Sequence, residues 1–237
     1  MPSQRFFIDA ELNENQNLTI SGKEFLHIVS VMRNKEKSSI EIVNGKEQLA
    51  KGIITKIEKT YLLLNIQEVI LKKNLDKIII YQALVPSNRL ETIIEKGTEL
   101  GITSFYLFPG DKSIKKNISK EQINRLKLIT ISAIKQCGRL DLPQISLLPP
   151  IKDWKKNNIP LPLFFGNVNA CSPKLTTALI SKDNFISYAI GPEGGFSQQE
   201  LQTLETLNIL GVNIHPYILR TETAAIAFAA LAKHLIS

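Results

Sequence analysis

The chain has 237 residues, of which 43% are hydrophobic and 22% charged, as in an ordinary globular protein of one large or two small domains. No apolar stretch is long enough to cross a bilayer, and no N-terminal run resembles a signal peptide. The two cysteines, Cys137 and Cys171, do not make a disulfide framework, and no spacing of Cys and His residues matches a zinc site. We therefore expect a reduced, cytoplasmic protein with no membrane span and no metal.

The charge balance is compatible with a polyanionic partner. There are 29 Lys and Arg residues against 22 Asp and Glu, a net charge of +7. Basic clusters recur at Lys72-Lys73, Lys112–Lys120 and Lys152–Lys156. Such clusters suit nucleic acid because each neutralised phosphate releases counterions, but solvated lysines give the same composition, so charge alone leaves both readings open.

The first 72 residues carry the alternation typical of half-buried strands, as in SSIEIVNGKEQLAKGIITKI at 38–57. Asn44-Gly45 between two such runs predicts a hairpin. One short helix is expected in GKEFLHIVSVMR at 22–33. This part of the chain therefore predicts a small β-barrel or sandwich.

From Asp76 onward, expected strands alternate with expected helices. The strands are KIIIYQALV at 77–85, SFYLFP at 104–109, PLFFGN at 162–167 and FISYAI at 185–190. The helices are NRLETIIEKGTELGI at 88–102, a long helix from a Ser119/Gln122 capping box through Cys137, and SPKLTTALIS at 172–181. This alternation predicts an α/β fold with a mostly parallel sheet and helices on both faces.

The stretch IGPEGGFSQQE at 190–200 lies where open α/β sheets bind ligands, at the carboxyl end of an expected strand. Ser197 and Glu200 form a capping box for the next helix. The loop has neither a Walker lysine nor dinucleotide-type glycine spacing, and Glu193 would repel a phosphate. It suits a ligand with polar or cationic groups, unless its glycines only allow a tight turn.

A second constellation, HPYILRTETAAIAFAALAKH at 215–234, joins a strand end to an alanine-rich helix. The polar run at 220–223 is unsuited to a core. Thr221 or Thr223 would serve as a helix cap. Arg220 has no such local use, although an ion pair with a glutamate would also explain it.

Together, IGPEGG at 190–195 and ILRTETA at 218–224 resemble the SPOUT methyltransferases, and specifically the ribosomal RNA small subunit methyltransferase E family, which makes N3-methyluridine in 16S rRNA. Similar stretches are RFF at 5–7, HIVSVMR at 27–33, EKGTELGI at 95–102 and QCGRLDLPQI at 136–145. The resemblance extends over nearly the whole chain.

The resemblance implies a PUA-like RNA-binding β-barrel at 1–72 and a SPOUT α/β domain at 73–237, with a deep trefoil knot at about 160–237. It implies a homodimer that acts on 16S rRNA of the small ribosomal subunit and binds S-adenosyl-L-methionine in the knot. The cofactor-binding residues carried over from the family pattern are Phe165, Gly166, Ile190, Gly191, Gly194, Gly195, Ile218, Leu219, Thr221, Thr223 and Ala224.

The charged residues beside the implied knot suggest catalytic roles. Arg220 would stabilise negative charge on a uracil oxygen, and Glu222 or Glu193 would accept the N3 proton or orient the base. Arg139 would reach the target nucleotide across the dimer, or else form a structural ion pair.

His27, Arg33 and Arg5 are the expected RNA contacts in the barrel. The alternatives are a partly buried core histidine for His27 and an ordinary surface arginine for Arg33. The chain departs from the family pattern at Ile214, His215 and Tyr217, ahead of ILR, and at Lys135, where a glutamate is common.

Other functions stay open at this point. One is a SPOUT enzyme that acts on tRNA or on a ribose 2′-hydroxyl, and another is a non-enzymatic RNA-binding protein, which S-adenosylmethionine binding would distinguish. A nucleotide-hydrolysing enzyme is disfavoured by the missing lysine and by Glu193 in the glycine loop.

Overall fold

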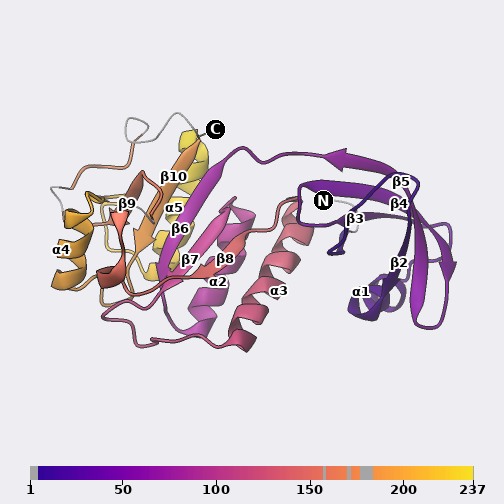
Figure 1. Cartoon of the computed structure of the whole chain (residues 1–237), viewed down its shortest axis with the longest axis horizontal. Helices are drawn as coiled ribbons and strands as arrows, with labels where there is room; N and C mark the ends of the chain where they lie inside the picture. The colour runs from indigo at the N-terminus through magenta and orange to yellow at the C-terminus, as the bar shows by residue number, and fades with distance from the viewer. Residues whose placement is uncertain (1–4, 157–158, 170–171, 177–183, 237) are drawn as a thin grey trace. The chain divides into compact units, whose positions relative to one another are not determined.

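The computed structural model describes residues 5–156, 159–169, 172–176 and 184–236. The chain divides into two compact units (Figure 1). The first comprises Met1–Asn74 and Ile131–Leu142, and the second comprises Leu75–Thr130 and Pro143–Ser237. None of the helices in these described ranges combines the length and the apolar character that a membrane crossing needs.

The first unit contains a curled five-stranded sheet, which confirms the predicted PUA-like architecture (Figure 1). Its strands are β1 (Arg5–Phe7), β2 (Asn17–Ser21), β3 (Ser39–Val43), β4 (Gln48–Ile57) and β5 (Tyr61–Leu71), in the order β1-β3-β4-β5-β2. Only the β1–β3 pair is parallel. Because side chains alternate along each strand, Ile42, Ile54 and Leu64 all point into one buried core.

Two local predictions for this unit are confirmed. The expected short helix is α1 (Gly22–Leu26), which continues as a π-helical turn, η1 (His27–Val31). Strands β3 and β4 form the hairpin predicted at Asn44-Gly45. Asn44 is buried, and its side-chain oxygen accepts hydrogen bonds from the backbone N–H of Lys46 at 2.8 Å and of Gln48 at 3.3 Å.

The segment 131–142 packs within the first unit, where Ile134 and Leu140 are buried against Val43 and Leu49. Lys135, one of the departures from the family pattern, forms an ion pair with Glu24 (Nζ to Oε1, 2.8 Å). The pair is largely shielded from solvent, so this lysine is accommodated by a carboxylate of its own unit.

The second unit is built on a six-stranded sheet in which every neighbouring pair is parallel, in the order β11-β9-β10-β6-β7-β8. Its strands are β6 (Lys77–Ala83), β7 (Ser104–Phe108), β8 (Gln144–Leu147), β9 (Leu163–Gly166), β10 (Phe185–Ile190) and β11 (Leu210–Val212). Four of the six were predicted from apolar runs. The other two, β8 and β11, are short and mostly only half-buried, and they give no such signal.

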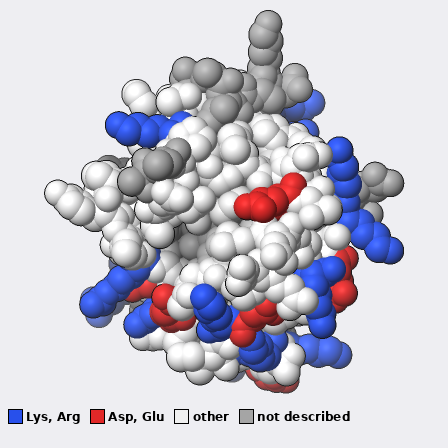
Figure 2. All heavy atoms as spheres, turned by 90° about the vertical axis from the view of Figure 1, so that its left-hand side faces the viewer, with Lys and Arg blue, Asp and Glu red and all other residues white. Residues whose placement is uncertain are grey.

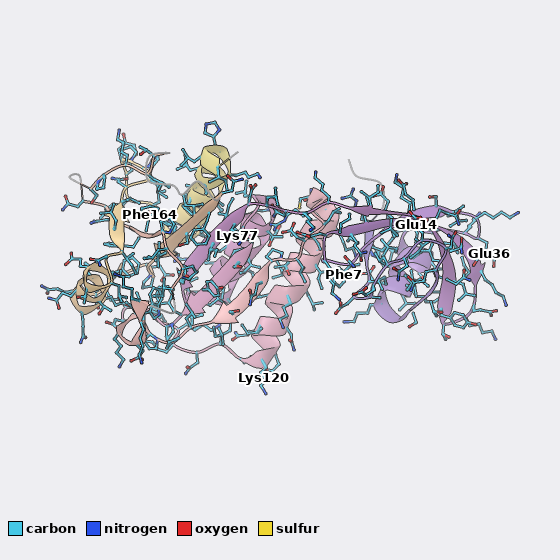
Figure 3. All side chains as sticks on the ribbon, turned by 45° about the horizontal axis from the view of Figure 1, so that its top comes forward. Phe7, Glu14, Glu36, Lys77, Lys120 and Phe164 are labelled. Carbon is cyan, nitrogen blue, oxygen red and sulfur yellow. The ribbon has the colours of Figure 1, made fainter. Side chains whose placement is uncertain are left out.

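Helices cover both faces of this sheet, as predicted. They are α2 (Ser87–Glu99), α3 (Lys120–Cys137), the 3₁₀ turn η2 (Ile151–Asp153), α4 (Gln198–Thr206) and α5 (Thr221–Ile236). Alternate β6 residues divide between the two faces. Ile78 and Ile80 pack with α2 and α5, whereas Ile79 and Tyr81 pack with η2 and α4. Figure 3 shows Lys77 on β6, Phe164 on β9 and Lys120 on α3.

The helix expected at 172–181 is wrong over its described part. Residues 172–176 are not helical, because their backbone pairs with Asn213: the N–H of Leu175 donates to the Asn213 carbonyl, and the N–H of Asn213 donates to that of Pro173. The rest of that segment, and Cys171, lie outside the described residues. The range of about 160–237 in which a trefoil knot is predicted contains residues 170–171 and 177–183, which also lie outside the described residues, so the knot stays a prediction.

Both predicted capping boxes are present. In α4, the Ser197 side chain accepts from the N–H of Glu200 at 3.1 Å, and Glu200 Oε2 accepts from the N–H of Ser197 at 2.7 Å. Ser119 and Gln122 form the same reciprocal pair before α3.

Ser197→Ala is expected to lower the free energy of unfolding by about 1–2 kcal/mol, because it removes the cap of α4 and the hydrogen bond that the Ser197 hydroxyl donates to Asp111. Thr206→Ala, at the exposed last residue of the same helix, is the control. Chemical denaturation of both variants tests this, and equal stabilities would contradict it.

Candidate active site

Three segments of the second unit surround a cavity of about 430 Å³ at the carboxyl ends of its parallel strands. They are the end of β9 at 166–168, the glycine loop after β10, and the segment from Asn213 to the start of α5. Parallel strands place their carboxyl ends at one edge, so segments distant in sequence meet there. The volume falls within the range of small-molecule sites.

A chain of buried hydrogen bonds joins these segments. Gln82, at the end of β6, donates from Nε2 to the Thr221 hydroxyl at 3.0 Å. Thr221 in turn donates to the carbonyl oxygen of Gly191 at 3.0 Å. Gln82 is fully buried and Thr221 is 5% exposed, so water competes little for these bonds. The start of α5 is therefore held to the glycine loop.

The glycine loop folds back on itself tightly. A Cβ atom on Gly191 would lie 3.2 Å from the backbone carbon of Gly195 and from the backbone nitrogen of Phe196. Gly195 adopts φ +68°, in the left-handed region that favours glycine. The tight turn thus explains why Gly191 and Gly195 are glycines. Since glycines have no side chain, the backbone of the loop forms part of the cavity wall.

Tyr188 on β10 forms an uncharged part of the wall. Its ring stacks on Phe228 of α5, with centroids 4.6 Å apart, and its hydroxyl donates to the Val212 carbonyl at 3.4 Å. Burial raises the pKa of Tyr188 above its ordinary value, so the phenol stays protonated at neutral pH.

Exposed apolar side chains line the rest of the cavity. Val168, Tyr217 and Ile218 are 68%, 76% and 82% exposed. His215 belongs to the same lining, and its Nδ1 accepts a hydrogen bond from the N–H of Tyr217 at 3.2 Å. Figure 2 shows the side of the molecule that carries α4, where uncharged residues surround one acidic patch near the middle of the face and Lys and Arg side chains lie mostly toward its edge.

Arg89 on α2 connects the two glutamates singled out in the sequence. Its Nη1 lies 2.5 Å from Glu193 Oε1, and its Nε lies 3.9 Å from Glu222 Oε1. The exposed fractions of the three side chains are 34%, 29% and 19%, so the pairs are partly shielded. One guanidinium therefore faces two carboxylates, one from the glycine loop and one from the first turn of α5.

Comparison with known proteins identifies the family. The family model described as an RNA methyltransferase domain matches residues 72–233, and that of an RNA methyltransferase PUA domain matches residues 20–67. The chain is 30% identical over 243 residues to ribosomal RNA small subunit methyltransferase E of Buchnera aphidicola subsp. Schizaphis graminum, with 94% of this chain and 92% of that protein covered. This chain belongs to the ribosomal RNA small subunit methyltransferase E family.

Other relatives agree. The methyltransferase E of Bacillus subtilis is 29% identical, with 93% of this chain and 92% of that protein covered. A putative methyltransferase from Legionella pneumophila, solved in complex with S-adenosylmethionine, has a TM-score of 0.88 at 24% identity and covers 99% of this chain and 98% of its own. The methyltransferase E of Neisseria gonorrhoeae, bound to S-adenosyl methionine, has a TM-score of 0.86 at 23% identity and covers the same shares. These two structures show that the fold is shared.

Most site residues expected for this methyltransferase E family member lie around one cavity. Its lining includes Gly166, Ile190, Gly191, Gly194, Gly195, Ile218, Leu219, Arg220, Thr221 and Ala224. Arg220 is exposed and forms no ion pair within the described part of the chain. Phe165, Glu222 and Thr223 are outside the described lining. Phe165 points to the other face of the sheet, where its ring packs on Phe196.

Arg139 belongs to the first unit, where its guanidinium pairs with Asp141 and its side chain is 12% exposed. Burial alone would raise the pKa of Asp141, but the hydrogen bond and charge of Arg139, with a hydrogen bond from Asn74, lower it. Arg139 thus has the structural ion pair that was its alternative role, and a further role at the target nucleotide stays a prediction.

The three expected RNA contacts differ in their surroundings. Arg5 donates to Glu41 and to the carbonyl of Gly138, both at 2.7 Å, and is largely buried. His27 is partly exposed, with its ring edge-on to Phe6 at 5.4 Å. Arg33 is exposed, with φ +55°, where the helical turn ends. None of these surroundings tests RNA binding.

Two residues of the site escaped the sequence analysis. Gln82 is an amide side chain within the apolar run KIIIYQALV at 77–85. A polar residue in a strand that is otherwise apolar indicates a buried hydrogen bond, because burial without a partner is costly. Arg89 belongs to the helix expected at 88–102, which was predicted from its apolar face alone. Its partners lie 104 and 133 residues further on, so nothing local indicates them.

A double-mutant cycle of Arg89→Gln and Glu193→Gln is expected to give a coupling free energy of about 0.5–1 kcal/mol, since the pair is close but partly exposed. The coupling should shrink as salt is added. Chemical denaturation of the four proteins measures it, and zero coupling at low salt would contradict the geometry.

Proposed function

We propose that this protein transfers a methyl group from S-adenosylmethionine to N3 of a uridine in 16S rRNA of the small ribosomal subunit. The observation that carries the proposal is the cavity at 190–195 and 213–221, which gathers the segments that resemble the family's cofactor site in a chain that belongs to the family.

The chemistry of the lining fits this cofactor. The backbone of Gly191, Gly194 and Gly195 is open to a ligand's polar edge, and the apolar side chains of Ile190 and Leu219 offer contact to an adenine ring. Glu193 lines the cavity and suits a cationic ligand group. Bound S-adenosylmethionine supplies an electrophilic methyl group on a sulfonium.

The protein's own residues would bring the uracil in line and manage its charge. Arg220 would donate to a uracil oxygen as negative charge develops there. Of the two carboxylates considered, Glu193 lines the cavity and Glu222 does not, which favours Glu193 for orienting the base or accepting the N3 proton. Arg89 would hold Glu193 in place through their ion pair, and Glu222 would be a second carboxylate beside the same guanidinium.

The domain roles follow from the family. We assign RNA binding to residues 1–72 through His27 and Arg33, with Arg5 as a supporting residue because its guanidinium is already engaged. Residues 73–237 would form the catalytic domain, with the trefoil knot at about 160–237.

A homodimer is part of the proposal. The exposed apolar side chains Val168, Tyr217 and Ile218 support it, because such residues often mark a protein interface. Arg139 would then contact the RNA bound to the partner.

Nucleoside mass spectrometry of small-subunit rRNA tests the substrate assignment. RNA from a strain that lacks the protein should lose N3-methyluridine, and the wild-type gene should restore it. Retention of the modified nucleoside in that strain would contradict the proposal.

Arg220→Ala should lower turnover at least about a hundredfold, because a preorganised donor to the developing oxyanion is lost. S-adenosylmethionine affinity should change less than about threefold, since an exposed side chain is removed and the backbone of the wall is kept. Methyl transfer to rRNA and calorimetric titration measure the two effects. Near-normal turnover would exclude this role for Arg220.

A further inference from the structure

The connection between β7 and α3 carries a concentrated positive charge. Between Pro109 and Lys120 there are four lysines, at 112, 115, 116 and 120, and one carboxylate, Asp111. We refer to residues 109–120 as the basic loop. Figure 3 shows its last residue, Lys120, at the start of α3, with its side chain directed away from the ribbon.

The lysines of the basic loop are held by neutral acceptors. Lys112 Nζ donates to the Gly194 carbonyl at 3.1 Å, and Lys115 Nζ donates to the Ser87 hydroxyl at 3.2 Å. Lys116 Nζ donates to the carbonyls of Gly110 and Asp111. A lysine ammonium has three donors, so each of these three lysines retains at least one donor for a further acceptor.

Within the described residues, none of the four lysines lies within ion-pair distance of a carboxylate. Some lysines elsewhere in the chain differ, since Lys51, Lys56, Lys96 and Lys135 are each paired with a glutamate. The basic loop therefore carries several ammonium groups without a carboxylate partner among the described residues, and phosphates of a polyanion could supply that partner.

The basic loop is attached directly to the wall of the candidate cofactor cavity. The N–H of Asp111 donates to Glu200 Oε1 at 2.9 Å, and the Asp111 carboxylate accepts from the Ser197 hydroxyl at 2.5 Å. With the bond from Lys112 to Gly194, three hydrogen bonds connect it to residues 194–200. The one carboxylate of the loop is thus turned toward α4.

An exposed apolar residue lies among these cations. Ile114 is 85% exposed between lysines on both sides. An aliphatic side chain flanked by ammonium groups can contact a sugar or base while its neighbours contact the backbone phosphates, as in many nucleic-acid interfaces.

We infer that the basic loop binds backbone phosphates of the substrate RNA beside the target nucleotide, as a second RNA contact in addition to the PUA-like unit. The inference rests on the proposed function for the identity of the RNA. Lys112 also donates a hydrogen bond to the carbonyl of Gly194, which lines the candidate cofactor cavity. One side chain would therefore contact both the RNA and the wall of the cavity.

The test compares two triple variants of the full chain. Lys112→Gln/Lys115→Gln/Lys120→Gln removes charge from the basic loop, and Lys152→Gln/Lys155→Gln/Lys156→Gln removes the same charge from another exposed basic cluster. Both are titrated with a 16S rRNA fragment over a range of salt concentrations, with S-adenosylmethionine affinity and thermal stability measured in parallel.

The basic-loop variant should bind RNA at least about tenfold more weakly, and its slope of log K against log salt should be smaller by about 2, as expected for three lost phosphate contacts. The control triple variant should keep the wild-type slope. A double variant, Lys115→Gln/Lys120→Gln, retains Lys112 and should lose part of the RNA affinity at unchanged S-adenosylmethionine affinity.

The inference would be overturned if the basic-loop variant kept the wild-type slope of log K against log salt. It would also be overturned if the control triple variant lost as much RNA affinity as the basic-loop variant. The same would follow if the double variant bound RNA like the wild type. Failure of the proposed function is a separate result: the wild-type protein would then yield no N3-methyluridine in the fragment, whatever the lysine variants bind.

Discussion

The hydrogen bonds from Gln82 to Thr221 and from Thr221 to Gly191 are the constraint on which the rest of the site depends. They join the end of a central strand, the first residue of α5 and the first residue of the glycine loop. The Gln82 and Thr221 side chains are buried, and Gly191 is partly buried, so loss of the Thr221 hydroxyl would leave polar atoms unpaired at a cost of about 1–3 kcal/mol. The parallel sheet places the ends of its strands at one edge, and these two hydrogen bonds hold the glycine loop and the start of α5 together around one cavity.

Contacts from outside the cavity hold the remaining walls. Arg89 reaches from α2 to Glu193, the capping box fixes the start of α4, and the basic loop is bonded to the same segment. The lining itself is mostly backbone and apolar surface, which is suited to a small ligand rather than to structural support. Two charged side chains, Glu193 and Arg220, also line it. Glu193 is paired with Arg89, whereas Arg220 is exposed without an ion pair in the described chain, as expected of a residue that contacts a substrate.

Local features of the fold could be predicted from the sequence because their causes are local. The Ser197 capping box and the Asn44 hairpin depend on neighbouring residues, and both are present. The region 172–176 was misread because its backbone pairs with Asn213, which is distant in sequence. The same limit applies to the site: motifs at 190–195 and 218–224 indicate its walls, whereas Gln82 and Arg89 act through partners more than a hundred residues away.

The proposed methyl transfer requires the cavity to bind S-adenosylmethionine, and the Thr221 hydroxyl joins two segments of its wall. Calorimetric titration of S-adenosylmethionine into the full chain and into Thr221→Val tests it most directly. The wild type should bind one equivalent per chain, and the variant should bind at least about tenfold more weakly, in line with the loss of two buried hydrogen bonds. Absence of binding by the wild type would contradict the proposed cofactor site, and equal affinity in the variant would contradict the role of the Thr221 hydroxyl.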